Sequence, residues 1–120
     1  MSNSPINFNK LKEMKEVMGE IFIQLVPAYI AESDVMISEM PQLLNSRSID
    51  VLERNAHSMK SSSLNVGAEK LSEIANEIED MSRDIDSTDI LKEKIIAITE
   101  EYAKVKIALQ DYLQLMQTKG

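Results

Sequence analysis

The chain of 120 residues contains no cysteine and no tryptophan, and its only histidine is His57. The absence of cysteine excludes disulfides, zinc–thiolate sites and thiol catalysis, and it suits a reducing compartment. There are only three glycines and three prolines to interrupt regular structure. No segment shows the alternation of polar and apolar residues that is typical of a half-buried strand. These absences favour a helical protein with a small chemical repertoire.

Positive charge is also scarce. Thirteen Lys and Arg against twenty Asp and Glu give a formal net charge of -7, and the basic residues are scattered along the chain. Nucleic-acid binding depends on clustered positive charge, and anionic lipid repels an acidic surface. The composition therefore argues against nucleic acid and membranes as partners, and it favours protein or small-molecule partners.

No apolar run is long enough to span a bilayer. The longest run, residues 21–31, is interrupted by Gln24 and Pro27 and falls short of the length that a membrane-spanning helix needs. The first five residues lack the basic flank and apolar core of a signal peptide. We expect a cytoplasmic protein that is a monomer.

Apolar residues recur at helical spacing through most of the chain, and turn-forming residues separate the repeats. The patterns predict helices over residues 8–18, 20–44, 48–66, 68–83 and 88–117. Short connections between long amphipathic helices favour an antiparallel up-down-up-down four-helix bundle. We therefore predict an all-α fold, with a short additional N-terminal helix, as a single domain over residues 1–120. Pro27 is expected to kink the second helix.

His57 lies on the outer side of the third predicted helix. At about 100° per residue, the side that faces the core is made up of Leu52, Ala56, Met59, Ser63 and Val66. The opposite side carries His57 together with Glu53, Arg54, Lys60, Ser61 and Leu64. Lys60 places an ammonium one turn after the imidazole, where it could neutralise an added anion, and Ser61 leaves room for a partner. From position alone, a single histidine on a helix surface is more often a solvated residue without a role, and that interpretation stays open here.

The sequence offers little other chemistry. It has no phosphate-binding loop and no glycine-rich dinucleotide turn, and no serine can be matched with a base and an orienting acid. A metal site is not expected, because His57 is a single histidine and the paired Glu-x-x-His motifs of di-iron bundles are missing. A nucleophilic histidine beside a cation can still accept a phosphoryl group that a partner activates.

The stretch around His57 resembles a known motif. Ala56-His57-Ser58-Met59-Lys60-Ser61-Ser62-Ser63-Leu64-Asn65-Val66-Gly67-Ala68, followed by Leu71 and Ile78-Glu79, is similar to the signature of histidine-containing phosphotransfer (HPt) domains of bacterial phosphorelays. The family pattern is Ala-His-x-Leu-Lys-Gly-Ser, then a Gly-Ala pair and a leucine at the start of the next helix. This chain has Ser61 where the family usually has glycine. It has Glu79 at the position aligned with a glutamine that contacts the phosphate in some members.

The resemblance implies a role for each matching residue. His57 would be phosphorylated on Nε2, Lys60 and Ser61 would stabilise the phosphate, and Gly67 would form the turn between the two hairpin helices. A receiver domain would dock over a surface that includes Glu53, Arg54 and Leu64. The chain itself would need no cofactor, because the Mg²⁺ is expected on the partner receiver domain.

The implied function is that of a phosphorelay carrier. His57 would accept a phosphoryl group from a receiver-domain phospho-aspartate and pass it to the aspartate of another receiver. The expected partners are response-regulator receiver domains and a hybrid sensor histidine kinase. The protein would not be an enzyme, because it has no ATP site and no kinase activity of its own. The alternative is a non-catalytic helical adaptor or scaffold that binds receiver domains.

Overall fold

The computed structural model describes residues 4–118, in which every regular element is a helix. The elements are α1 (Phe8–Met18), α2 (Ile21–Asn45), α3 (Ile49–Asn65), α4 (Glu69–Met81), the short 3₁₀ helix η1 (Ile85–Ser87) and α5 (Thr88–Thr118). The all-α helical bundle predicted from the sequence is therefore confirmed. Each of the five predicted helices is present, and their ends differ from the prediction by at most two residues.

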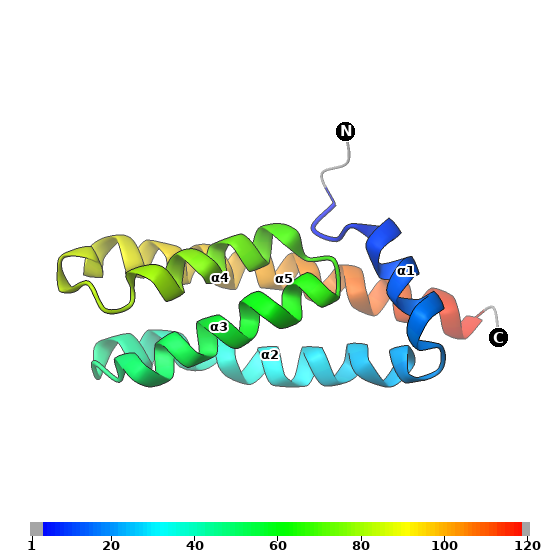
Figure 1. Ribbon diagram of the computed structural model, residues 1–120, viewed down its shortest axis with the longest axis horizontal. Coiled ribbons are helices and arrows are strands. Elements are labelled where there is room, and N and C mark those ends of the chain that lie inside the picture. The colour runs from blue at the N-terminus through cyan, green and yellow to red at the C-terminus, as the bar shows by residue number, and fades with distance from the viewer. Residues whose placement is uncertain (1–3, 119–120) are drawn as a thin grey trace.

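The four long helices lie side by side, and α1 packs against one end of them (Figure 1). α3 packs against α2 and α4, and α5 packs against the same two helices, so the four surround a single apolar core. This core contains all five residues that the sequence places on the inner side of α3: Leu52, Ala56, Met59, Ser63 and Val66. His57 is consequently turned away from the core.

One core contact is polar. Ser63 is fully buried, and its hydroxyl lies 2.7 Å from the hydroxyl of Tyr29 on α2. Burial raises the pKa of Tyr29 to about 12, although its hydrogen bond to Ser63 acts in the opposite direction. The bond gives both buried hydroxyl groups a partner, and it links α2 to α3.

α2 has the length predicted from the sequence, 25 residues, and it is an apolar helix. By length and composition alone, its 25 residues would be enough to cross a membrane. However, α2 also packs against α3 and α5 and contributes seven buried residues to the bundle, among them Phe22, Val26 and Met40. α2 therefore supplies one side of the apolar core. Pro27 and Pro41 both lie within this helix.

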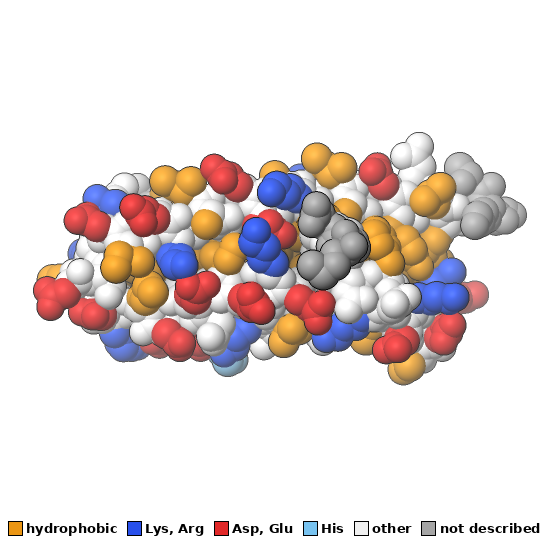
Figure 2. Space-filling view, turned by 90° about the horizontal axis from the view of Figure 1, so that it is seen from above, with side chains coloured by type: hydrophobic (Ala, Val, Ile, Leu, Met, Phe, Trp, Pro, Cys, Tyr) orange, Lys and Arg blue, Asp and Glu red, His pale blue; other side chains and the backbone are white. Residues whose placement is uncertain are grey.

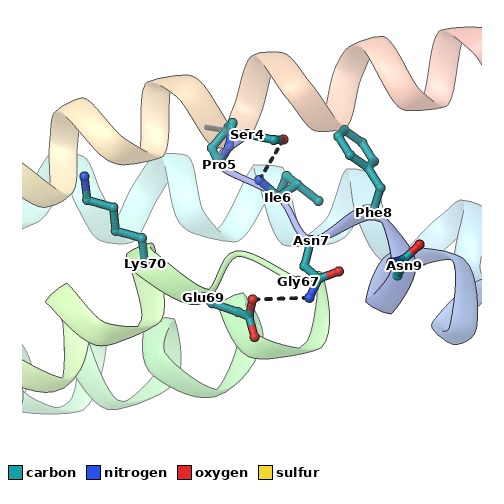
Figure 3. A pocket seen from close by; sticks show the side chains of 9 residues that line it. All are labelled: Ser4, Pro5, Ile6, Asn7, Phe8, Asn9, Gly67, Glu69 and Lys70. Atoms are coloured by element: carbon teal, nitrogen blue, oxygen red, sulfur yellow. Dashed lines mark hydrogen bonds between the residues drawn. The ribbon is translucent and has the colours of Figure 1, made fainter. Parts of the chain in front are cut away.

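The turn between α3 and α4 requires a glycine. Gly67 has φ 78°, and its amide donates to the carbonyl oxygen of Leu64 at 3.1 Å. The N-terminal segment lies against this turn: the backbone N–H of Asn7 donates to the Gly67 carbonyl oxygen at 2.8 Å, and the Asn7 side-chain amide donates to Oε1 of Glu69 at 3.3 Å, the second of which is drawn in Figure 3. A Cβ atom on Gly67 would lie 2.7 Å from the Asn7 carbonyl oxygen. The close approach and the positive φ both exclude a larger residue without strain.

The start of α3 has no side-chain cap. Ser48 is the N-cap residue, but its side chain does not bond the first turn; its hydroxyl lies 2.9 Å from that of Ser46. Asp50 occupies the first turn, and its carboxylate accepts a hydrogen bond from Arg83 beyond the end of α4. The polar side chains here make contacts within the turn and with α4's end rather than capping α3.

Candidate functional site

His57 projects from the middle of α3 into solvent, and its side chain is 60% exposed. The face of the molecule shown in Figure 2 carries acidic and basic side chains intermixed with apolar ones. The ring is nevertheless not free. Its Nδ1 atom lies 2.7 Å from Oε2 of Glu79, on the adjacent helix α4.

Glu79 connects His57 to Lys60. While one carboxylate oxygen contacts the imidazole, the other accepts a hydrogen bond of 2.6 Å from the Lys60 ammonium. The same ammonium donates to Oδ1 of Asn76 at 3.3 Å. The Glu79 side chain is only 21% exposed, so this bridge lies in the seam between α3 and α4 rather than on the open surface.

The bridge determines where the imidazole holds its proton. The pKa of Glu79 is lowered by its hydrogen bond to Lys60 and, to a lesser extent, by its bond to His57, so the carboxylate is ionised and can only accept. The neutral ring must therefore donate its proton from Nδ1. Nε2 is left with a free lone pair on the opposite side of the ring. This is the arrangement that a nucleophilic histidine requires.

The antiparallel alignment of α3 and α4 brings these groups together. Three cross-helix contacts follow one register: Arg83 with Glu53, Glu79 with His57, and Asn76 with Lys60. A fourth contact is the hydrogen bond of 2.7 Å that the Ser72 hydroxyl donates to the Lys60 carbonyl oxygen. Glu79 is held opposite His57 because the helices are fastened on both sides of it.

The predicted site residues fall into two groups. His57, Glu53 and Arg54 line a hollow of about 370 Å³, and Asp50, Glu79 and Arg83 complete its wall. Lys60 and Leu64 instead line a second hollow of about 530 Å³ between α3 and α4. Ser61 is exposed between them on the outer surface of α3, and Leu64 is 40% exposed.

Two predicted residues are less available than the sequence suggested. Lys60 is bonded to Glu79, and Glu53 accepts two hydrogen bonds from Arg83, at 2.9 and 3.0 Å. Sequence reasoning noted Glu79 only as an aligned position and did not find Arg83. Both Glu79 and Arg83 could have been found from the register of the two antiparallel helices. The position of Gly67 and the apolar positions of each helix constrain that register. Within residues 4–118, no group of three potential ligands that could hold a metal ion is found.

Comparison with known proteins identifies the family of this chain. The sequence profile of the family described as Hpt domain matches residues 24–118, which include all of α3, α4 and α5. The chain belongs to the Hpt domain family. Members of this family are phosphocarriers rather than kinases, and they work with response regulators and histidine kinases in phosphorelays. The resemblance seen in the motif around His57 is thereby confirmed, and with it a role as a histidine phosphotransfer carrier.

Solved structures share the fold of this HPt domain. Histidine-containing phosphotransfer protein B from Pseudomonas aeruginosa PAO1 superposes with a TM-score of 0.82 at 24% identity, over 94% of this chain and 97% of that one. A putative histidine-containing phosphotransfer protein from rice superposes with a TM-score of 0.84 at 20% identity, over 100% of this chain and 89% of that one. No curated protein sequence matches the chain.

Proposed function

We propose that this HPt domain carries a phosphoryl group between two receiver domains on Nε2 of His57. The observation that supports this most strongly is the contact between Nδ1 and Glu79, because in the neutral ring it keeps the proton on Nδ1 and leaves the Nε2 lone pair free on an exposed ring. The ring needs no pocket, because phosphoryl transfer depends on in-line positioning and charge neutralisation, which a docked partner can supply.

The transfer step can be written from these atoms. The Nε2 lone pair of His57 attacks the phosphorus of a phospho-aspartate, the bond from phosphorus to the aspartate oxygen breaks, and the carboxylate leaves with the electron pair. The ring proton stays on Nδ1, so the product is a phosphorylated imidazolium whose positive charge faces Glu79. In the onward step an aspartate of a second receiver attacks phosphorus, and a neutral imidazole leaves. We propose that Glu79 acts as a positioning residue in both directions.

Lys60 is the proposed stabiliser of the bound phosphoryl group, as the family motif implies. To do this, its ammonium must either break its 2.6 Å hydrogen bond to Glu79 or donate to the Glu79 carboxylate and to the phosphoryl group at the same time. Ser61 has an exposed hydroxyl one turn after His57, within reach of a phosphoryl group or a docking partner. Glu53, Arg54 and Leu64 are proposed as parts of the docking surface, because they flank His57 on the same face of α3.

We also propose where the domain acts and where its phosphate comes from. The domain would be a cytoplasmic monomer comprising the whole chain, would need no cofactor, and would receive its phosphate ultimately from a hybrid sensor histidine kinase. Any Mg²⁺ in the reaction would belong to the receiver. A helical adaptor that binds receivers without accepting phosphate is the competing function. It gives no reason for an exposed His57 ring whose Nδ1 is held by Glu79.

A two-step relay assay tests the proposal. A receiver domain is phosphorylated with radiolabelled acyl phosphate, freed of excess reagent and mixed with the wild-type protein, and an unlabelled second receiver is added afterwards. We expect label to appear on this protein and then to move to the second receiver, while His57→Gln receives none. Label that reaches His57→Gln, or a wild type that binds the receiver without taking label, would exclude the carrier function and favour the adaptor.

A further inference from the structure

Three cations lie close to His57, and two of them are engaged by carboxylates. Lys60 is bonded to Glu79 at 2.6 Å. Arg83 is bonded to Asp50 at 2.7 Å and to Glu53 at 2.9 Å, and these carboxylates raise its pKa above the usual range. Over the residues that the structure describes, no carboxylate forms an ion pair with the third cation, Arg54. Its charge is therefore available to an incoming anion.

Arg54 lies one turn before His57 on the same face of α3, and the two residues line the same hollow together with Arg83. Lys60, one turn after His57, lines a different hollow between α3 and α4.

The two candidate counter-charges differ in what they must give up. If Lys60 turned to a phosphoryl group, Glu79 would lose its ammonium partner while a second anion arrived nearby. Arg54 is exposed and breaks no ion pair on meeting the same anion. A guanidinium can also bond two phosphoryl oxygens at once, which an ammonium does less well.

We propose that the Arg54 guanidinium contacts the phosphoryl group as it transfers to Nε2 of His57 and supplies its first counter-charge. This inference rests on the proposed function and gives Arg54 a direct role in the transfer, beyond that of a docking residue. Because the side chain is exposed, its effect is expected to be smaller than that of a buried arginine and to weaken with added salt.

The test uses phosphoramidate, a small donor that brings no receiver surface with it. In this reaction the bond from Nε2 to phosphorus forms, the nitrogen–phosphorus bond of phosphoramidate breaks, and ammonia leaves. We expect Arg54→Gln to label His57 about tenfold more slowly than wild type, the loss of one charged hydrogen bond. Arg54→Lys should stay within about threefold of wild type, because it keeps the charge.

A matched control is Arg47→Gln, which removes an exposed arginine from the turn between α2 and α3. It should label at the wild-type rate, and far-ultraviolet circular dichroism should show all variants equally helical. Increasing the ionic strength to about 1 M, where charges are screened within about 3 Å, should reduce the Arg54→Gln defect.

Two results would overturn the proposal. The first is phosphoramidate labelling of Arg54→Gln at the wild-type rate, even if transfer from a receiver falls, since Arg54 would then act only in docking. The second is a defect in Arg54→Lys as large as in Arg54→Gln, because the charge would then not be what matters. Neither result depends on whether receivers label the wild type, so a failure here is distinct from a failure of the carrier function.

Discussion

Replacing Glu79 with glutamine tests the arrangement on which the nucleophile depends. The substitution conserves shape and removes the charge that accepts from both Nδ1 of His57 and the Lys60 ammonium. A glutamine can present its oxygen to only one of these donors, and its amide group must face the other. Either Lys60 is released, or the ring shifts its proton from Nδ1 to Nε2 and loses its nucleophilic lone pair.

The size of the effect follows from the exposure of the ring. A hydrogen bond to a charged group contributes about 1.5–3 kcal/mol, which corresponds to a rate loss of about tenfold to about a hundredfold. Water can replace part of this bond, because the His57 side chain is 60% exposed. We therefore expect the lower end of the range, about a tenfold slower single-turnover transfer from an excess of phosphorylated receiver.

The defect should persist across the neutral pH range. Hydrogen bonds to Lys60 and His57 hold the pKa of Glu79 below its ordinary value, so the wild-type carboxylate stays charged from about pH 8 to about pH 5. Glu73→Gln removes the same charge from an exposed position on the same helix and should transfer normally. Transfer by Glu79→Gln at the wild-type rate, or an equal loss in Glu73→Gln, would refute the positioning role.

Three further substitutions probe the phosphate site and the scaffold. Lys60→Ala should slow transfer and shorten the lifetime of the phosphorylated protein while far-ultraviolet circular dichroism stays unchanged; a loss of helicity would indicate a structural role instead. Asp34→Asn should lower the melting temperature by about 4 °C at neutral pH, about 1 kcal/mol, because a neutral amide oxygen accepts from the Tyr102 hydroxyl more weakly than the carboxylate does and no longer pairs with Lys106. The hydrogen bond from Tyr102 holds the pKa of Asp34 below 3.8, so the difference should be complete above that pH and vanish as pH falls through the lowered value; a difference unchanged in acid would contradict this. Gly67→Ala should destabilise the fold by about 1–3 kcal/mol in urea titrations, because φ is 78° and the new Cβ meets the Asn7 carbonyl, and an unchanged midpoint would show that the turn relaxes freely.

Much of the fold was predictable because it depends on local periodicity. The apolar positions of α3 identified its buried side correctly, and the helix ends followed from turn-forming residues. The largest error at a helix end was in α4, which was predicted to reach residue 83 and ends at Met81. There the Asp84 side chain accepts a hydrogen bond from the Asp86 backbone amide and caps η1. This side-chain bond competes with continuation of the helix, and the spacing of apolar residues does not reveal it.

The site was predictable only in part, for a physical reason. The positions of His57, Lys60 and Ser61 on one face follow from the turn of a single helix. The partner of His57 lies 22 residues away on another helix, and only the register of the antiparallel pair brings it into contact. Ion pairs between the two helices then determine which cations are free to meet a phosphoryl group. Lys60 was expected to be a free cation beside the imidazole, but it is bonded to Glu79.

The most direct test of the account is nitrogen NMR of the imidazole. Because His57 is the only histidine, a protein labelled with ¹⁵N gives imidazole signals from one residue and needs no assignment. Before reaction, the spectrum should show a proton on Nδ1 and a bare Nε2. After incubation with a phosphorylated receiver, phosphorus coupling should appear on Nε2, with the proton still on Nδ1. Coupling on Nδ1, or an unchanged imidazole spectrum while the receiver's phosphate is lost, would contradict the account.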